Sequence, residues 1–276
     1  MPEIRVILPE KMENQIESLI REGHVGNKAE IVRTALAQYL LSMPSLSQKE
    51  YDTMLEFSPN GRIYQVEYAY EAVNKGPIAV GVCCDEGMTL IKAPNFTRSQ
   101  PTWISPTHRF IDRLNERIAI ASCGIGGDGQ AIIRFARALL KDSEAPDAGD
   151  INSVADQVAA FVHACTLKTD ARPLGASLII GGLDLAGTPQ LYSIDPSGTL
   201  WYCHVYAIGG QSQEAMHTLL IGITSVATLD DAIQLGLAAA LQGKDNVEDY
   251  SVDVISKMSP QLRALSVDEI LQYYEK

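Results

Sequence analysis

The stretch FSPNGRIYQVEYA, residues 57 to 69, decides the fold of this chain of 276 residues. Its segment from Ser58 to Gly61 contains Ser, Pro, Asn and Gly, the residues that favour tight turns. Apolar residues then recur at helical spacing as far as Lys75, with Arg62 and Glu67 on the outer side. The stretch therefore predicts a turn that begins an amphipathic helix.

These thirteen residues resemble the N-terminal signature of proteasome α-type subunits, and the resemblance covers about residues 51 to 274. It continues in the phrases 71–73, 75–76, 134–137, 172–175, 176–182, 195–199 and 207–210. The resemblance implies an α/β (α+β) fold, the four-layer αββα sandwich of N-terminal-nucleophile hydrolases. It also implies that the signature helix lies across the outer face of a seven-membered ring.

The residues after the signature alternate between strand patterns and helix patterns, which predicts a layered protein. Strands are predicted at 78–84, 88–91, 118–123, 176–181, 190–193, 200–208 and 250–255. Helices are predicted at 61–75, 130–141, 151–168, 211–221, 229–241 and 267–274.

Residues 1 to 44 predict a separate small module. Residues 3 to 8 alternate as a strand does, a helix follows from Pro9 to Glu22, and Asn27 with Glu30 forms a capping box for a second helix. Residues 45 to 50, rich in Ser and polar side chains, are predicted to link this module to the domain of residues 51 to 276.

The order strand, helix, helix and the phrase GNKAEIVR at residues 26 to 33 resemble the ribbon-helix-helix family over residues 3 to 41. That resemblance implies dimerisation through paired strands. In DNA-binding members it also implies contacts to DNA, here from Arg5 and Lys28. We expect pairing of subunits more than DNA binding, because Glu3 and Ile7 on the same strand face are poor readers of DNA.

We expect no catalytic residue. In the resembled superfamily, catalytic β-type subunits use a Thr that proteolysis frees after a Gly, so that its own amine serves as the base. The equivalent segment here is Gly76-Pro77-Ile78, and proline has neither a hydroxyl nor a primary amine. The sequence therefore predicts a structural or gating subunit rather than an enzyme.

The resemblance also implies contact residues for an activator or a neighbouring subunit. Pro59, Glu67 and Gly76 match the family pattern, and Arg109 stands near the place of a family Lys that binds a carboxylate. Tyr51 and Asp52 match the start of the family's gate. The Arg expected next is Thr53, which removes a guanidinium fork.

No cofactor or metal is predicted. The segment GIGGDG, residues 124 to 129, satisfies a dinucleotide-binding pattern, but the acids that follow lie in a polar loop between two helices. We read it as a strand-to-helix turn in which glycine permits close packing. The five His and five Cys residues show no metal-ligand spacing.

Bulk composition narrows the function classes. A net charge of −12 disfavours broad binding to nucleic acid or anionic membranes, and the apolar runs are too short to span a bilayer. We expect a cytoplasmic homo-oligomer, with catalytic β-type subunits and an ATPase activator as further partners. Two alternatives stay open, a DNA-binding regulator with a proteasome-like oligomerisation domain and a self-contained threonine-type peptidase.

Overall fold

The computed structural model describes residues 9–22, 26–42, 57–94, 110–142, 149–168, 170–243 and 247–274. The chain divides into two compact units, Met1–Thr53 and Met54–Lys276.

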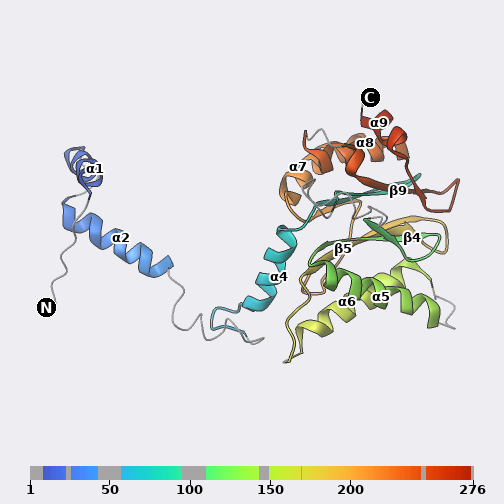
Figure 1. Cartoon of the computed structure of the whole chain (residues 1–276), viewed down its shortest axis with the longest axis horizontal. Helices are drawn as coiled ribbons and strands as arrows, with labels where there is room; N and C mark the ends of the chain where they lie inside the picture. The colour runs from blue at the N-terminus through green and yellow to red at the C-terminus, as the bar shows by residue number, and fades with distance from the viewer. Residues whose placement is uncertain are drawn as a thin grey trace, which may run out of the picture. The chain divides into compact units, whose positions relative to one another are not determined.

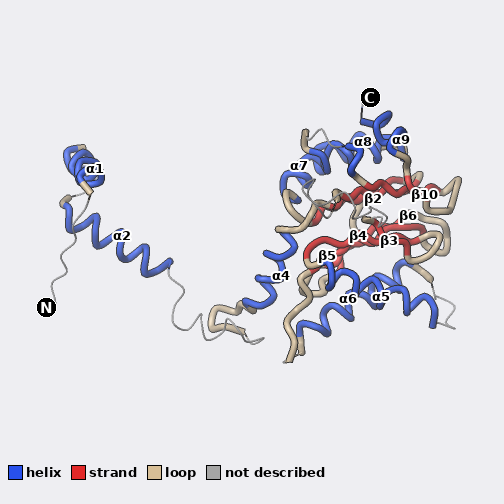
Figure 2. The backbone as a smooth tube through the Cα atoms, viewed as in Figure 1, coloured by secondary structure: helices blue, strands red, loops and turns tan. Residues whose placement is uncertain are grey.

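In the larger unit, two five-stranded antiparallel sheets lie face to face between two layers of helices (Figures 1 and 2). The first sheet has the order β10 (Arg263–Ala264), β9 (Ser251–Ser256), β2 (Gly87–Lys92), β1 (Ala79–Cys84) and β8 (Val205–Ile208). The second has the order β3 (Ile111–Arg113), β4 (Ile118–Gly124), β5 (Ala176–Leu183), β6 (Pro189–Ile194) and β7 (Leu200–Tyr202).

The helices cover the outer faces of these sheets. Helices α7 (Ser212–Gly222), α8 (Leu229–Leu241) and α9 (Val267–Tyr274) lie on the first sheet, together with the 3-10 turns η1 (Ile223–Ser225) and η2 (Val247–Asp249). Helices α5 (Gly126–Asp142) and α6 (Ile151–Thr166) cover the second sheet. Helix α4 (Tyr64–Asn74) precedes β1.

Three apolar layers hold the sandwich together, because each sheet alternates its side chains between two buried faces. One layer lies under α7, α8 and α9, one lies under α5 and α6, and the third fills the space between the sheets. Val73 of α4 packs into this middle layer beside Ala79 and Cys123. The predicted four-layer sandwich is confirmed.

The predicted strand 200–208 is wrong in one respect, because it is two strands in different sheets. The amide of Cys203 still donates to Leu191 O in the second sheet at 3.0 Å, whereas His204 O accepts from Cys83 N in the first sheet at 2.7 Å. The chain therefore crosses the sandwich between these two residues. The apolar pattern continues through the crossing, so periodicity alone does not reveal it.

Other elements also differ from the prediction. Helix α5 begins at Gly126, so most of the glycine-rich segment forms its first turn. The signature helix begins at Tyr64 instead of residue 61, after the turn. Strands β3 and β10 were not predicted, since two or three residues carry too little periodicity.

The smaller unit contains helices α1 (Glu10–Arg21) and α2 (Lys28–Ser42). At the start of α2, Asn27 Oδ1 accepts from Glu30 N at 2.9 Å, which is the predicted N-cap. Glu30 Oε2 accepts from Gly26 N at 2.9 Å, one residue before the amide that a capping box uses. On α1, Ile16 is buried, but Met12 is 50% exposed and Leu19 is 41% exposed. The predicted strand 3–8 lies outside the described residues, and the ribbon-helix-helix assignment stays a prediction.

Candidate functional site

The signature turn holds the chain in place ahead of α4. Gly61 N donates to Ser58 O at 2.8 Å, and Ser58 N donates back to Arg62 O at 2.9 Å. Gly61 has a φ of 75°, a conformation that costs glycine little and other residues more. Ser58 is buried and Pro59 is exposed. Pro59 is thus available to a partner, while Ser58 fixes the turn.

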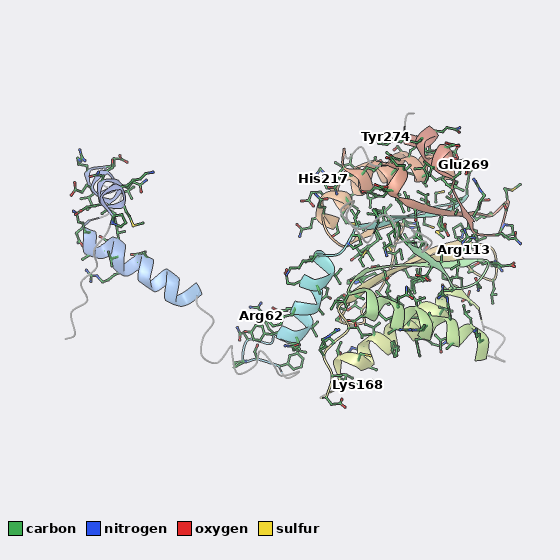
Figure 3. The ribbon with its side chains drawn as sticks, viewed as in Figure 1. Arg62, Arg113, Lys168, His217, Glu269 and Tyr274 are labelled. Atoms are coloured by element: carbon green, nitrogen blue, oxygen red, sulfur yellow. The ribbon has the colours of Figure 1, made fainter. Side chains whose placement is uncertain are left out.

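Glu67 forms an ion pair with Arg62 one helical turn away. Arg62 Nε donates to Glu67 Oε1 at 2.7 Å, and Arg62 Nη2 bonds Glu67 Oε2. This hydrogen bond lowers the pKa of Glu67, so the carboxylate stays ionised at neutral pH. The guanidinium also lies over the ring of Tyr64, 5.1 Å from its centroid. Figure 3 places Arg62 at the end of α4 that is far from the sheets.

Gly76 lies after the opposite end of α4, where the chain enters β1. A Cβ atom at this position would stand 2.6 Å from Gly124 N, so only glycine fits without moving the backbone. Gly76 O accepts from Gly210 N at 2.9 Å. Nine residues separate Glu67 from Gly76, or about 13 Å along a helix. Glu67 in the first turn of α4 and Gly76 after its last turn therefore lie at opposite ends of the helix.

A pocket of about 250 Å³ opens beside Gly76. Its walls come from the start of β1, the residues after β2, the N-terminal end of α7 and η2. The residues that line it are Gly76, Pro77, Ile78, Ala93, Pro94, Gly210, Gln211, Asp249 and Tyr250. None of these residues carries an aliphatic hydroxyl, a thiol or an amine side chain. Within the described residues, the lining therefore lacks a Ser, Thr, Cys or Lys side chain.

The remaining predicted site residues divide into two groups. Arg109, Tyr51, Asp52 and Arg5 lie outside the described residues. Lys28 is described, and its Nζ is 2.8 Å from both Glu13 Oε1 and Glu17 Oε1 of α1. The Lys28 ammonium, to which the resemblance assigns a DNA contact, is thus already paired with two carboxylates.

An ion pair that the sequence patterns did not reveal fixes the start of α5. Asp128 Oδ2 accepts from Arg172 Nη1 at 2.6 Å and from Gly175 N at 2.8 Å. Burial raises the pKa of Asp128, but these hydrogen bonds outweigh burial and lower it overall. Asp128 lies within the glycine-rich segment, and Arg172 and Gly175 lie in a phrase of the family resemblance. The glycine-rich segment 124–129 and the segment 172–175 are thus joined by one structural contact.

The turn, helix α4 and the two face-to-face sheets define a sandwich of the N-terminal-nucleophile hydrolase type. A family model described as proteasome subunit matches residues 73–255, and the N-terminal signature of A-type proteasome subunits matches residues 51–72. The chain belongs to the proteasome subunit family, and its N-terminal signature is the α-type one.

Archaeal relatives support this assignment. The proteasome alpha subunit of Methanosphaerula palustris is 32% identical over 237 residues, which cover 83% of this chain and 96% of the relative. The proteasome alpha 1 subunit of Haloferax volcanii is 34% identical, with 83% and 92% covered. The proteasome alpha subunit of Methanothermobacter thermautotrophicus is 33% identical, with 85% and 96% covered. Both family matches begin after residue 50.

Proposed function

We propose that this chain is a non-catalytic α-type subunit that builds and gates the end of a proteolytic chamber. The observation that carries the proposal is the α-type signature folded as a turn and helix that lead into Gly76-Pro77. Separate β-type chains would supply catalysis in this assembly, and the subunit would work in the cytoplasm without a cofactor. None of the described helices combines the length and apolar composition that a membrane crossing requires.

The first strand supports the absence of catalysis. Residues 77 to 80 are Pro, Ile, Ala and Val, so the segment after Gly76 supplies no hydroxyl or thiol nucleophile. The chain ahead of Gly76 is also part of the folded body, because Tyr64, Ala69 and Val73 of α4 are buried. Its removal as a propeptide would strip these side chains from the core.

We expect the purified protein to hydrolyse no peptide. A fluorogenic peptide panel tests this expectation, and a threonine-directed covalent inhibitor should leave the intact mass unchanged. A catalytically active β-type protein serves as the positive control. Turnover that persists after host proteases have been removed would contradict the proposal, as would an adduct on residue 77 or 78.

The two ends of α4 support a docking role shared between neighbouring copies. An activator's terminal carboxylate needs a cation, and we assign this role to Arg109 on the family resemblance. Neither Pro59, in the turn before α4, nor Glu67, in the first turn of α4, lines the pocket at Gly76 in one chain. We infer that one subunit contributes Gly76 and Arg109, whereas the adjacent subunit contributes Pro59 and Glu67. Tyr51 and Asp52 would form the gate ahead of this surface.

Glu67→Ala should impair docking or ring contacts more than it impairs folding. The pair with Arg62 is partly exposed, so its loss should change the free energy of unfolding by only about 0.5 kcal/mol. Thermal melting and native mass measure the two effects separately. Glu71→Ala, an exposed acid on the same helix, is the matched control. A large loss of thermal stability in Glu67→Ala would show that Glu67 is structural.

The N-terminal module is proposed to pair subunits or rings. Its half-exposed Met12 and Leu19 are the kind of surface that a second copy covers. The ion pairs of Lys28 with Glu13 and Glu17 count against a phosphate contact there, because two carboxylates repel a nucleic-acid backbone. No observation on the larger unit favours a DNA-binding regulator or a self-contained peptidase.

A further inference from the structure

Lys92, the last residue of β2, is a cation in the middle layer of the sandwich. Only 3% of its surface is exposed. Alternate residues of a strand point to the same face, so its side chain lies on the face of Met88 and Leu90, both of which belong to the core between the sheets. Among the described residues, Lys92 and Asp253 are the buried charged ones.

The acids near Lys92 are already bonded to other cations. Asp253 of β9 accepts from Arg113 Nε of β3 at 2.9 Å. Asp112 accepts from Arg137 Nη2, also at 2.9 Å. Within the part of the chain that the structure describes, the Lys92 side chain has no hydrogen bond or ion pair.

The other groups around Lys92 do not supply a counter-ion. Its direct cross-strand neighbours, Ala79 of β1 and Ser251 of β9, are uncharged. The titratable groups on the elements packed against β2 are Cys83 and Cys84 of β1, Asp112 and Arg113 of β3, Cys123 of β4, Tyr192 of β6, Asp253 of β9, and Asp230 and Asp231 at the start of α8. Tyr192 packs on the helix side of its sheet, and Asp231 caps α8.

Lys92 lies beside the contacts that seat the C-terminal end of α4. The Cys123 thiol donates to Pro77 O at 2.8 Å, and it also bonds the backbone of Ala79, the residue opposite Lys92. Val73 of α4 packs into the same core layer. Lys92 therefore borders the layer that holds α4 and the start of β1.

We propose that Lys92 is a pH-sensitive element beside the contacts that hold the C-terminal end of α4. The protonated side chain loosens the packing around Val73 and Pro77, and the neutral side chain tightens it. This role is distinct from the docking role of α4, because it makes the position of that helix depend on a group inside the sandwich.

The sign of the pH effect follows from burial. Burial lowers the pKa of Lys92 from the ordinary value of 10.5, because the interior disfavours the ammonium form. Between the two pKa values the unfolded chain holds the extra proton, so stability rises with pH in that interval. The penalty is fully present below the folded-state pKa and disappears as the pH approaches 10.5.

Hydrogen exchange of the full chain tests the proposal. Amide exchange of residues 64–78 is followed from pH 6 to pH 10.5 and corrected for the intrinsic dependence of exchange on pH. In the wild type, protection should rise with pH across the interval between the lowered pKa of Lys92 and 10.5. Lys92→Met should be protected at every pH. Lys92→Arg should be poorly protected at every pH, because guanidinium keeps its charge.

Lys75→Met is the matched control, since Lys75 is an exposed lysine at the end of the same helix. It should keep the pH dependence of the wild type. The same pH dependence in Lys92→Met as in the wild type would overturn the proposal. So would exchange in the wild type that does not change with pH. If Lys92→Met fails to fold, a Lys92→Arg profile that follows the wild type would overturn it equally.

Discussion

Gly124→Ala is expected to destabilise the larger unit by about 3 kcal/mol or more. Gly124 has a φ of 108°, and a Cβ atom there would stand 2.2 Å from Gly175 O. Its backbone also lies against Gly76. The obstructing atoms belong to the backbone, so no change of rotamer relieves the clash. Urea unfolding measures the loss.

Gly126→Ala provides the control for this prediction, two residues along the chain. It lies in the first turn of α5, and a Cβ atom there would meet nothing within 4 Å. Alanine favours a helix over glycine by up to about 1 kcal/mol, so this variant should be as stable as the wild type or more stable. Equal losses in the two variants would show that the segment depends on something other than this close approach.

The difference in space around Gly124 and Gly126 also explains the dinucleotide-like pattern of residues 124 to 129. Glycine is required at position 124, where the backbone of Gly175 lies against it. Position 126 has room for a side chain. Asp128 bonds Arg172 and Gly175, so the acid of the pattern serves the fold. The motif is an outcome of backbone packing, in agreement with its interpretation as a strand-to-helix turn.

Short sequence motifs correctly predicted the elements whose ends depend on residues close to them in the sequence. Helix α8 spans residues 229 to 241 as predicted, because Thr228 and Asp231 form a capping box at its start. Helix α9 also has its predicted bounds, and the signature turn was predicted from its Ser, Pro, Asn and Gly. These features depend on neighbours within a few residues.

Features that depend on distant residues could not be predicted in this way. Strand periodicity does not reveal the crossing at Cys203, because the residues before and after it are both in strands. Lys92 follows five buried residues of β2, but its burial depends on pairing with β1 and β9. The predicted contact residues Pro59, Glu67 and Gly76 came from the family resemblance alone. Their division between the two ends of α4 required the structure.

The second large expected effect is a change in the number of subunits when the smaller unit is removed. This unit resembles a module that pairs, and it is joined to a larger unit that resembles a member of a seven-membered ring. Seven is odd, so pairing within one ring would leave one module without a partner. Two rings that meet through their N-terminal faces would pair every module, and so would a simple two-subunit protein. In the first arrangement the modules would also stand between the gate and an activator.

Deletion of residues 1 to 49 should therefore lower the native mass by far more than the deleted residues account for. Paired rings or paired subunits should come apart when the modules are removed, because on this proposal the modules supply the pairing contacts. Light scattering or native mass spectrometry gives the number of subunits before and after the deletion.

Two full-length variants test whether apolar contact between modules produces this effect. Met12→Glu combined with Leu19→Glu places charges on the half-exposed face of α1 and should separate the assembly as the deletion does. Lys11→Glu, also on α1 and exposed, should leave the number of subunits unchanged. If the truncated protein keeps the subunit number of the full chain, the module does not govern assembly, and DNA or another macromolecule becomes its expected partner.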